Sequence, residues 1–223
     1  MKKKIIVVTE DGSHTLFFPE LNEHYHSVHG AVAESMHVFI EAGLKPKLIN
    51  SQPLNILEVG LGTGLNAALT LVEAEKSKTI MSYFAVEPNP LQAEDILQLN
   101  YSDVSGSNRM KEVIPAIHAA SRENEVHISP LFVFNYFEKR IQDVEFENDS
   151  FDVVYFDAFS PGVQPEMWTI EVFQKIFSSM KPGGILVTYV AKGEVRRTMK
   201  ACGFTIEKLP GFAGKREMTR AMK

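Results

Sequence analysis

Residues Asn55 to Leu69 read NILEVGLGTGLNAAL and place three glycines between an apolar run and a helix-like stretch. The apolar run predicts a buried strand, and the stretch from Leu65 to Lys76 predicts a helix. The three glycines therefore lie on a strand-to-helix turn. In an open α/β sheet, the first such turn is the usual place for a ligand.

The spacing of Gly60, Gly62 and Gly64 helps to choose between ligands. The dinucleotide fingerprint G-x-G-x-x-G would put its third glycine at position 65, where this chain has Leu65. Glu58, two residues before the first glycine, would repel a pyrophosphate but suits a ligand with a cationic end, such as S-adenosylmethionine. The alternatives are that the glycines only relieve a tight corner and that Glu58 reaches water at a strand end.

The next apolar run ends in FAVEPNP and places Glu87 at the carboxyl end of a second strand. Nucleoside-binding sheets use a carboxylate here, about 20 residues after the glycines, to accept the ribose hydroxyls. Enzymes that use NAD share this feature. Glu87 therefore indicates a nucleoside without identifying it.

The rest of the chain alternates apolar runs with amphipathic ones, which predicts a mainly parallel sheet with helices on both faces. Before this pattern, Asp11-Gly12 between two apolar runs predicts an N-terminal hairpin, followed by a helix from Gly30 to Ala42 that Gly43 caps. We expect further strands or helices, in chain order, in LQAEDILQLN (helix), VHISPLFVFNYF (a third strand), FDVVYFDAF, Glu166 to Met180 (helix), GILVTYVA, Gly193 to Ala201 (helix), GFTIEKL and REMTRAM, the last two as a closing hairpin.

Length and composition predict one compact domain of 223 residues, with residues 1–50 as an extension packed on a core at 51–223. The single cysteine, Cys202, excludes an internal disulfide and suits a reducing compartment. No apolar stretch approaches the roughly 20 residues that cross a bilayer, and only four apolar residues follow Met-Lys-Lys-Lys. We expect a cytoplasmic protein.

The run FDVVYFDAFSPG places Asp157 at the end of another strand, directly before a turn. A carboxylate there, with the ring of Phe159 beside it, would position a substrate amine and exclude water. The alternative is that Asp157 is a turn former and Phe159 a core residue.

Five blocks of this sequence resemble one known family: DGSHTLFFPELNEHYHSVHGAVAESMHVFI, ILEVGLGTGLNA, DAFSPGVQPEMWT, YVAKGEVRRTM and LPGFAGKREMTRA. Together they look like the methyltransferase domain of MnmC, the bifunctional tRNA wobble-uridine modification enzyme. The resemblance extends from Asp11 to Ala221. The glycine motif is common to many methyltransferases, whereas PELNEHYHS, DAFSP and GKRE are more particular to this family.

This resemblance implies a class I S-adenosylmethionine-dependent methyltransferase fold, Rossmann-like with a seven-stranded sheet. The implied reaction moves a methyl group to the aminomethyl nitrogen of 5-aminomethyl-(2-thio)uridine in tRNA. Asp157 would lie against the reacting amine, beside Phe159. The residues implied to hold the cofactor are Glu58, Gly60, Gly62, Gly64, Asn66 and Glu87, with Tyr25 and Ser27 reaching the same site.

The sequence departs from the family in two places. It ends at Lys223, so we expect the FAD-dependent oxidase half to be absent and a separate enzyme to supply the aminomethyl-uridine substrate. The third strand also lacks the Gly-Asp that often follows it in such folds, so the sequence assigns no residue to the adenine.

Methyl transfer to an amine requires a neutral nitrogen with a free lone pair. If the aminomethyl group titrated like lysine, only about one molecule in 10³ would be neutral at pH 7, a cost of roughly 4 to 5 kcal/mol. An ionised Asp157 would raise the pKa of the amine further. We therefore expect Asp157 to orient the amine after the proton leaves through water.

The basic residues are concentrated near the C-terminus. The net charge of −5 divides into +7 for residues 181–223 and −12 for residues 1–180, which is typical of a polyanion-binding patch on an acidic body or of solvated terminal elements. Phe159, Trp168 and Phe212 are candidates to stack on bases. The candidate contacts to tRNA, near its anticodon, are Lys192, Arg196, Arg197, Lys200, Lys215, Arg216 and Arg220.

We expect no metal, because the spacing of His24, His26 and His29 does not fit a ligand cluster. Two other functions remain open. An aminopropyltransferase of the spermidine-synthase type would share the fold and the carboxylates, and a non-catalytic RNA-binding module would keep the fold without binding the cofactor. An NAD-dependent oxidoreductase ranks last because of the glycine spacing.

Overall fold

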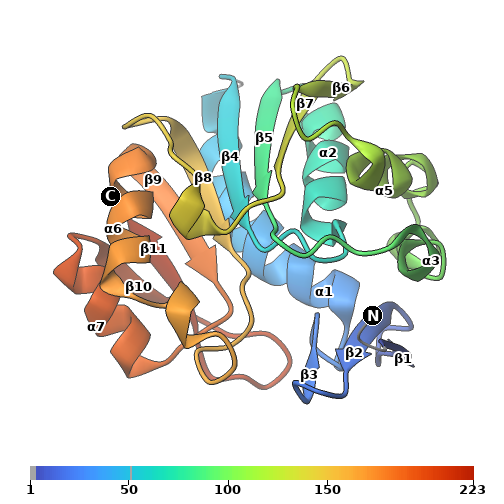
Figure 1. Cartoon of the computed structure of the whole chain (residues 1–223). Helices are drawn as coiled ribbons and strands as arrows, with labels where there is room; N and C mark the ends of the chain where they lie inside the picture. The colour runs from blue at the N-terminus through green and yellow to red at the C-terminus, as the bar shows by residue number, and fades with distance from the viewer. Residues whose placement is uncertain (1–3, 51) are drawn as a thin grey trace.

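The structure is a computed structural model that describes residues 4–50 and 52–223. Its centre is an eight-stranded sheet in the order β10-β11-β9-β8-β4-β5-β7-β6 (Figure 1). The five central strands pair in parallel, as expected, and the outer strands pair antiparallel. The strands are β4 (Leu54–Val59), β5 (Met81–Val86), β6 (Val126–Ser129), β7 (Phe132–Phe137), β8 (Phe151–Phe156), β9 (Met180–Thr188), β10 (Thr205–Leu209) and β11 (Met218–Met222).

Helices cover both faces of this sheet (Figure 1). Successive strand residues point to opposite faces, so Ile56 joins one buried cluster and Leu57 the other. The Ile56 side packs on α2 (Leu65–Ser77), α5 (Met110–Ala119) and the N-terminal helices, and the Leu57 side packs on α6 (Ile170–Ser179) and α7 (Gly193–Ala201). Two short helices complete the edge near α5: α3 (Ala93–Ile96) and α4 (Tyr101–Ser105). Burial on both faces explains why the central strands are continuous apolar runs.

The strand order reverses between β4 and β8, and this places the functional site. From β4 the chain proceeds outward through β5 to β7, and it then returns to the other side of β4 to form β8 and β9. The carboxyl ends of β4 and β8 therefore open a crevice at the point of reversal, which is where open α/β sheets bind ligands.

The N-terminal part forms a second, three-stranded antiparallel sheet, with its hairpin at Asp11-Gly12 as predicted. Asp11 fixes this turn, because its carboxylate accepts hydrogen bonds from the backbone N–H of Ser13 at 2.9 Å and of Ala33 at 3.0 Å. The hairpin is thereby attached to the helix that follows. Its strands are β1 (Ile5–Val8), β2 (His14–Phe18) and β3 (Glu23–His24).

The N-terminal helix differs from the expectation, because Gly43 is not its cap. The helix begins at Ala31 as α1 (Ala31–Ser35), widens into the π-helix η1 (Met36–Leu44) and tightens into the 3₁₀-helix η2 (Lys45–Asn50). A Cβ on Gly43 would lie 2.7 Å from a methyl group of Val187. The glycine therefore allows the helix to approach β9 closely, and the helix continues past it.

Three other expectations require correction. The run expected to hold one third strand folds back on itself as β6 and β7, so the sheet has eight strands and not seven. Helix α6 begins at Ile170 rather than Glu166, because η4 (Pro165–Met167) precedes it and Thr169 caps it. The sequence analysis also missed α4 and α5. Among the described helices, none combines the length and apolar character that a membrane span requires.

Candidate active site

The turn between β4 and α2 requires glycine for reasons of space as well as conformation. Gly60 has a φ of +94°, and a Cβ there would lie 2.5 Å from the backbone oxygen of Asp157. Gly64, with a φ of +77°, begins α2, and a Cβ on it would lie 3.0 Å from Nε2 of His118. The alternative that the glycines relieve tight backbone geometry is therefore correct in part. At Gly60 a side chain is excluded because the backbone at the end of β8 lies directly beside it.

Gly62 differs, because it faces a side chain and not backbone. Its φ is +51°, and a Cβ on it would lie 2.9 Å from the ring of Tyr25. Tyr25 follows β3, so the N-terminal extension lies over the glycine turn. The Tyr25 ring continues into an aromatic wall, 5.3 Å from the ring of Phe159 and 5.7 Å from that of Phe18.

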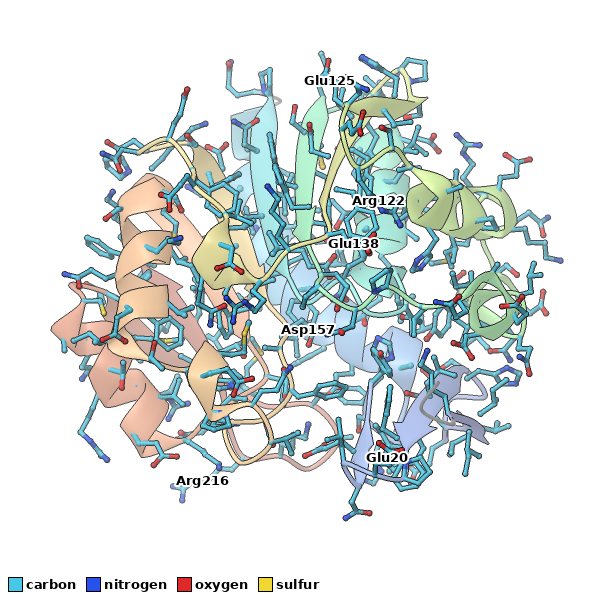
Figure 2. All side chains as sticks on the ribbon, in the orientation of Figure 1. Glu20, Arg122, Glu125, Glu138, Asp157 and Arg216 are labelled. Atoms are coloured by element: carbon cyan, nitrogen blue, oxygen red, sulfur yellow. The ribbon has the colours of Figure 1, made fainter. Side chains whose placement is uncertain are left out.

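Two carboxylates from neighbouring strands meet at the side-chain amide of Asn66. Asn66 Nδ2 donates to Glu58 Oε1 and to Asp157 Oδ2, at 2.9 Å in each case. Asn66 lies in the first turn of α2, so the turn that begins at Gly60 also delivers this amide. Figure 2 shows Asp157 near the middle of the molecule, between the central sheet and the N-terminal sheet. Asn66 thus joins the two residues that the sequence assigned separately to cofactor and substrate.

Burial makes both carboxylates reluctant to ionise. Glu58 has no exposed surface, and burial raises its pKa well above the usual range, with the hydrogen bond from Asn66 opposing and the charge of Asp157 adding to the shift. Burial likewise raises the pKa of Asp157 to about 7, with Glu34 adding to the shift and Asn66 and Lys215 opposing it.

The site fits a cationic ligand. Asn66 Oδ1 is buried and accepts no hydrogen bond from the described residues. Glu58 Oε2 is likewise buried and has no hydrogen-bond partner among the described residues, so the site holds two unsatisfied acceptor atoms. A ligand that brings positive charge and N–H donors would satisfy these groups.

Glu87 lies where a ribose-binding carboxylate is expected, at the carboxyl end of β5. Its oxygens accept backbone hydrogen bonds from Asn89 at 2.8 Å and from Gly62 at 3.3 Å. Burial raises the pKa of Glu87, while these two hydrogen bonds and the charge of Lys4 lower it. The bond to Gly62 attaches this carboxylate to the glycine turn.

The carboxyl end of β7 adds residues that the sequence analysis did not single out. Arg122 lies 3.9 Å above the ring centre of Tyr136 and pairs with Glu138 at 3.2 Å, and the two charged residues are labelled side by side in Figure 2. β7 pairs with β5, and the N–H of Glu87 donates to Phe137 at 3.0 Å. This cluster therefore borders the Glu87 side of the crevice.

Phe159 is held by its backbone as well as its ring. Its carbonyl accepts a hydrogen bond from Trp168 Nε1 at 2.9 Å, and the neighbouring carbonyl of Ala158 accepts one from the hydroxyl of Tyr189 at 3.0 Å. Trp168 is buried against Phe156, which makes it a support for the turn and not a surface for stacking bases.

Ser27 reaches the site through Glu34, a residue that the sequence analysis missed. The N–H of Ser27 donates to Glu34 Oε2 at 2.7 Å, and Lys215 donates to Glu34 Oε1 at 2.9 Å. The sequence did offer one signal for Glu34, because it is an acidic residue among the apolar side chains of the predicted N-terminal helix. Its partner is 181 residues away and could not be predicted from spacing.

The predicted tRNA-binding cations fall into different environments. Arg196 is only 7% exposed, and its guanidinium donates to Thr219, Glu217 and the carbonyl of Met218. Its contacts indicate a structural role, joining α7 to β11. Arg220 is likewise engaged, by Glu207 and the carbonyl of Ala42. The exposed members of the set are Lys192, Arg197, Lys200, Lys215 and Arg216.

Two adjoining cavities run along these exposed cations. The larger, of about 710 Å³, extends from Ser160 and Pro161, just after the Asp157 turn, to Lys192, Lys215 and Arg216. The smaller, of about 310 Å³, is lined by Arg197 and Lys200 among others. Gly193, Arg196 and Lys208 line both cavities. Below, this continuous feature is called the basic groove.

The three clustered histidines do not converge. His26 is buried beside Thr63, and burial lowers its pKa to about 4, whereas His29 is exposed and pairs with Glu10. In the part of the chain that the structure describes, no group of three histidine, cysteine or carboxylate residues has the arrangement of a metal site.

Comparison with known proteins places this geometry in a family. A family described as S-adenosyl-L-methionine-dependent methyltransferase matches residues 107–223. The chain is 30% identical to the tRNA 5-methylaminomethyl-2-thiouridine biosynthesis bifunctional protein MnmC of Cupriavidus metallidurans, over 96% of this chain and 33% of that protein. MnmC of Cupriavidus necator is 28% identical, over 92% and 32%. The chain thus spans about a third of these relatives.

Solved structures agree with this match. The crystal structure of MNMC2 from Aquifex aeolicus matches with a TM-score of 0.80 and 26% identity, over 100% of this chain and 70% of that one. Spermidine synthase from Thermotoga maritima matches with a TM-score of 0.56 and 11% identity, which shows a shared fold alone. The expected fold, cofactor and resemblance to MnmC are confirmed, and the chain belongs to the family of S-adenosyl-L-methionine-dependent methyltransferases.

Proposed function

We propose that this enzyme methylates the aminomethyl nitrogen of 5-aminomethyl-(2-thio)uridine at the wobble position of tRNA. The names of the similar MnmC proteins support a role in tRNA modification. The structural observation that carries the proposal is the amide of Asn66, which joins Glu58 beside the glycine turn to Asp157 beside Phe159. A cofactor with a cationic end and a substrate amine would then meet at one polar cluster.

The cofactor, when bound, supplies an electrophilic methyl group on a sulfonium centre. The residues of this chain bind and orient it from two sides. Glu58 would pair with the ammonium of the amino-acid end, Asn66 would hydrogen-bond to the same end, and Glu87 would accept hydrogen bonds from the ribose hydroxyls. The full set assigned to the cofactor is Glu58, Gly60, Gly62, Gly64, Asn66, Glu87 and Tyr25, with Ser27 acting through Glu34.

Besides orienting the substrate amine, Asp157 would accept the proton of the substrate ammonium. An ordinary aspartate is about 6 to 7 pKa units more acidic than a lysine-like amine, which makes that transfer unfavourable by roughly 9 kcal/mol. With its pKa raised to about 7, Asp157 halves this cost, to roughly 4 to 5 kcal/mol. We therefore assign Asp157 as proton acceptor and orienting group, which goes beyond the orienting role expected from sequence.

Phe159 and Tyr25 exclude water from the reacting atoms and restrict the approach of the amine. Their rings are 5.3 Å apart at 61°, so they form an edge-to-face wall beside Asp157. Holding the nitrogen in line with the methyl group supplies roughly 7 to 11 kcal/mol of the acceleration in well-oriented reactions. This positioning is the main contribution that we assign to the N-terminal extension, residues 1–50.

The basic groove would hold RNA phosphates near the anticodon. It begins at Ser160, three residues after Asp157. A wobble nucleotide flipped out of the anticodon loop would then lie between the groove and Asp157. We assign Lys192, Arg197, Lys200, Lys215 and Arg216 to this surface. We also propose that the protein acts in the cytoplasm and that a separate enzyme supplies the aminomethyl-uridine.

Mass spectrometry tests the proposed reaction directly. tRNA carrying aminomethyl-uridine is incubated with the protein and S-adenosylmethionine, and the modified nucleoside should gain one methyl group. Asp157→Ala should lose at least 10²-fold in rate, as expected for a general base. A parallel reaction with putrescine and decarboxylated S-adenosylmethionine should give no product. Aminopropyl transfer without methylation of tRNA would refute the proposal in favour of a polyamine enzyme.

A further inference from the structure

Glu34 ties three separate segments together beside the candidate site. It lies on α1 and its side chain is only 10% exposed. One carboxylate oxygen accepts the N–H of Ser27 from the N-terminal loop, and the other accepts the ammonium of Lys215 from the loop between β10 and β11. A buried carboxylate needs such partners, because removing one of them leaves an uncompensated polar group in the interior.

A tight turn in the loop between β10 and β11 places Lys215 against Glu34. Ala213 and Gly214 both have positive φ, +47° and +79°, and the N–H of Lys215 donates to the carbonyl of Phe212 at 3.1 Å. This is the geometry of a tight type I′ turn. The start of the loop is held as well, because His37 Nε2 lies 2.8 Å from the carbonyl oxygen of Pro210. The helix that bears Glu34 therefore fastens the loop at both ends.

Lys215 also belongs to the surroundings of the reacting carboxylate. Its ammonium lies 5.2 Å from the ring centre of Tyr189, whose hydroxyl binds the carbonyl of Ala158, next to Asp157. The same lysine lines the basic groove. It therefore connects the groove, the turn after β8 and the buried Glu34.

The charged and titratable groups that act on Asp157 come from five segments. They are Glu34 of α1, Lys215 of the β10–β11 loop, Glu58 of β4, Tyr83 of β5 and Tyr189 at the end of β9. Asn66 of α2 adds a hydrogen bond from a neutral amide. The negative charge of Glu34 raises the pKa of Asp157, and the positive charge of Lys215 lowers it. The two members of the ion pair thus act on Asp157 in opposite senses.

We propose that Glu34 and Lys215 are a positioning pair for Asp157: their ion pair holds the C-terminal loop against α1 and places the Lys215 ammonium over the ring of Tyr189, which is hydrogen-bonded to the turn that carries Asp157. Removing either member leaves the other as an uncompensated charge beside Asp157. The inference that this pair affects proton transfer from the substrate rests on the proposed function. The inference that it affects the titration of the Asp157 carboxyl group is independent of that function.

The direct test is the titration of the Asp157 carboxyl carbon by NMR, assigned by its loss in Asp157→Asn. Glu34→Gln keeps an oxygen for Ser27 but removes the negative charge, and it should lower the apparent pKa of Asp157. Lys215→Met should raise it. A shift of about one pH unit in each direction is expected when a charge that acts on the carboxyl group is removed. Lys215→Arg should restore the unmutated value.

A second variant separates this effect from general damage to the groove. Lys208→Met removes another cation that lines the groove but that pairs with Glu217 and is not among the charges that shift the pKa of Asp157. It should raise the KM for tRNA and leave the pKa of Asp157 unchanged. In the methylation assay, the acidic limb of kcat at saturating tRNA should follow the NMR values for Glu34→Gln and Lys215→Met.

Shifts of the same sign in both variants, or no shift in either folded variant, would overturn the proposal. Failure of the proposed function gives a different result. In that case, the unmutated protein would not methylate the tRNA, while the carboxyl titrations would still move in opposite directions.

Discussion

Glu58 and Asp157 lie at the ends of neighbouring strands and share one hydrogen-bond donor, the amide nitrogen of Asn66, at 2.9 Å from each. Each carboxyl is more easily ionised because of that donor, and the charge of Asp157 makes ionisation of Glu58 harder. The proposed cofactor-binding group and the proposed proton acceptor are therefore coupled through one side chain. A positive charge that binds near Glu58 should also alter the proton affinity of Asp157.

Replacement of this donor should damage both functions together. In Asn66→Ala the pKa values of Glu58 and Asp157 should rise further, because the hydrogen bond that lowers them is lost. We expect the affinity for S-adenosylmethionine, measured by calorimetry at pH 7.5, to fall about 10-fold, which corresponds to one hydrogen bond to a charged group. The acidic limb of the rate profile should move to higher pH.

Asn55→Ala is the matched control for this prediction. Asn55 lies at the other end of β4, where its amide donates to the carbonyl of Ser150 at 3.0 Å. Its replacement should lower stability without changing cofactor affinity or the pH profile. Equal losses of affinity in the two variants would show that the Asn66 effect comes from disturbed packing of the sheet.

Ionisation of Asp157 should cost stability. Its pKa is about 7 in the folded protein against an ordinary value of 3.8, so the folded state binds more protons between these values. The free energy of unfolding should therefore fall as pH rises from about 4 to 7, and the full cost applies above pH 7. Asp157→Asn removes this cost, and it should stabilise the protein at pH 8 by on the order of 4 kcal/mol and hardly at all at pH 4.

Denaturant unfolding at the two pH values measures the difference. Asp103→Asn, on the short helix α4, removes a carboxylate that is partnered by Lys111 at the surface and serves as the control. A stabilisation of Asp157→Asn that is equal at pH 4 and pH 8 would contradict the assigned cause.

Gly62→Ala should separate strain in the turn from contact with the site. The φ of +51° costs an alanine roughly 1 to 2 kcal/mol, and the new methyl group would also push against the Tyr25 ring. Gly106→Ala has a comparable φ of +68° with nothing within 4 Å. Both variants should lose stability in thermal melts, Gly62→Ala at least as much as Gly106→Ala, whereas only Gly62→Ala should lose affinity for S-adenosylmethionine. Unchanged affinity there would show that Tyr25 does not border the cofactor.

The parts of the site that follow local rules were predictable from sequence. The glycine turn, the carboxylate that ends β5 and the hairpin at Asp11-Gly12 each depend on residues within a few positions of one another. The strands of the central sheet were also predictable, because burial on both faces leaves a continuous apolar run. Gly43 resembled a helix cap because a cap and a close helix–strand contact both require the absence of a side chain.

The remaining features depend on contacts between distant segments. Asn66 meets Asp157 across 91 residues and Glu34 meets Lys215 across 181, so no spacing rule brings either pair together. Arg196 shows the same limit. The sequence placed it with Lys200 among the candidate tRNA contacts, but the docking of β11 against β9 provides buried partners that turn the guanidinium inward.

Arg196 and its exposed neighbours should therefore respond differently to substitution. Arg196→Met leaves the buried carbonyl of Met218 and the hydroxyl of Thr219 without their donor, and it should destabilise the protein by about 3 kcal/mol. Lys192→Ala and Arg216→Ala should leave the melting temperature unchanged. Each should weaken tRNA binding and reduce the slope of log K against log salt by about one, as expected when a single phosphate contact is lost.

Filter binding of tRNA between 50 and 200 mM salt measures these slopes, and Lys111→Ala on α5 provides an exposed lysine away from the basic groove as control. An unchanged slope for both groove variants would remove the groove from the RNA-binding surface. A reduced slope of log K against log salt for Arg196→Met, without loss of stability, would show that Arg196 contacts RNA. The melting temperature and the salt slope together distinguish a structural cation from an RNA-binding one. A buried cation contributes to folding, whereas an exposed cation that contacts phosphate contributes to counterion release.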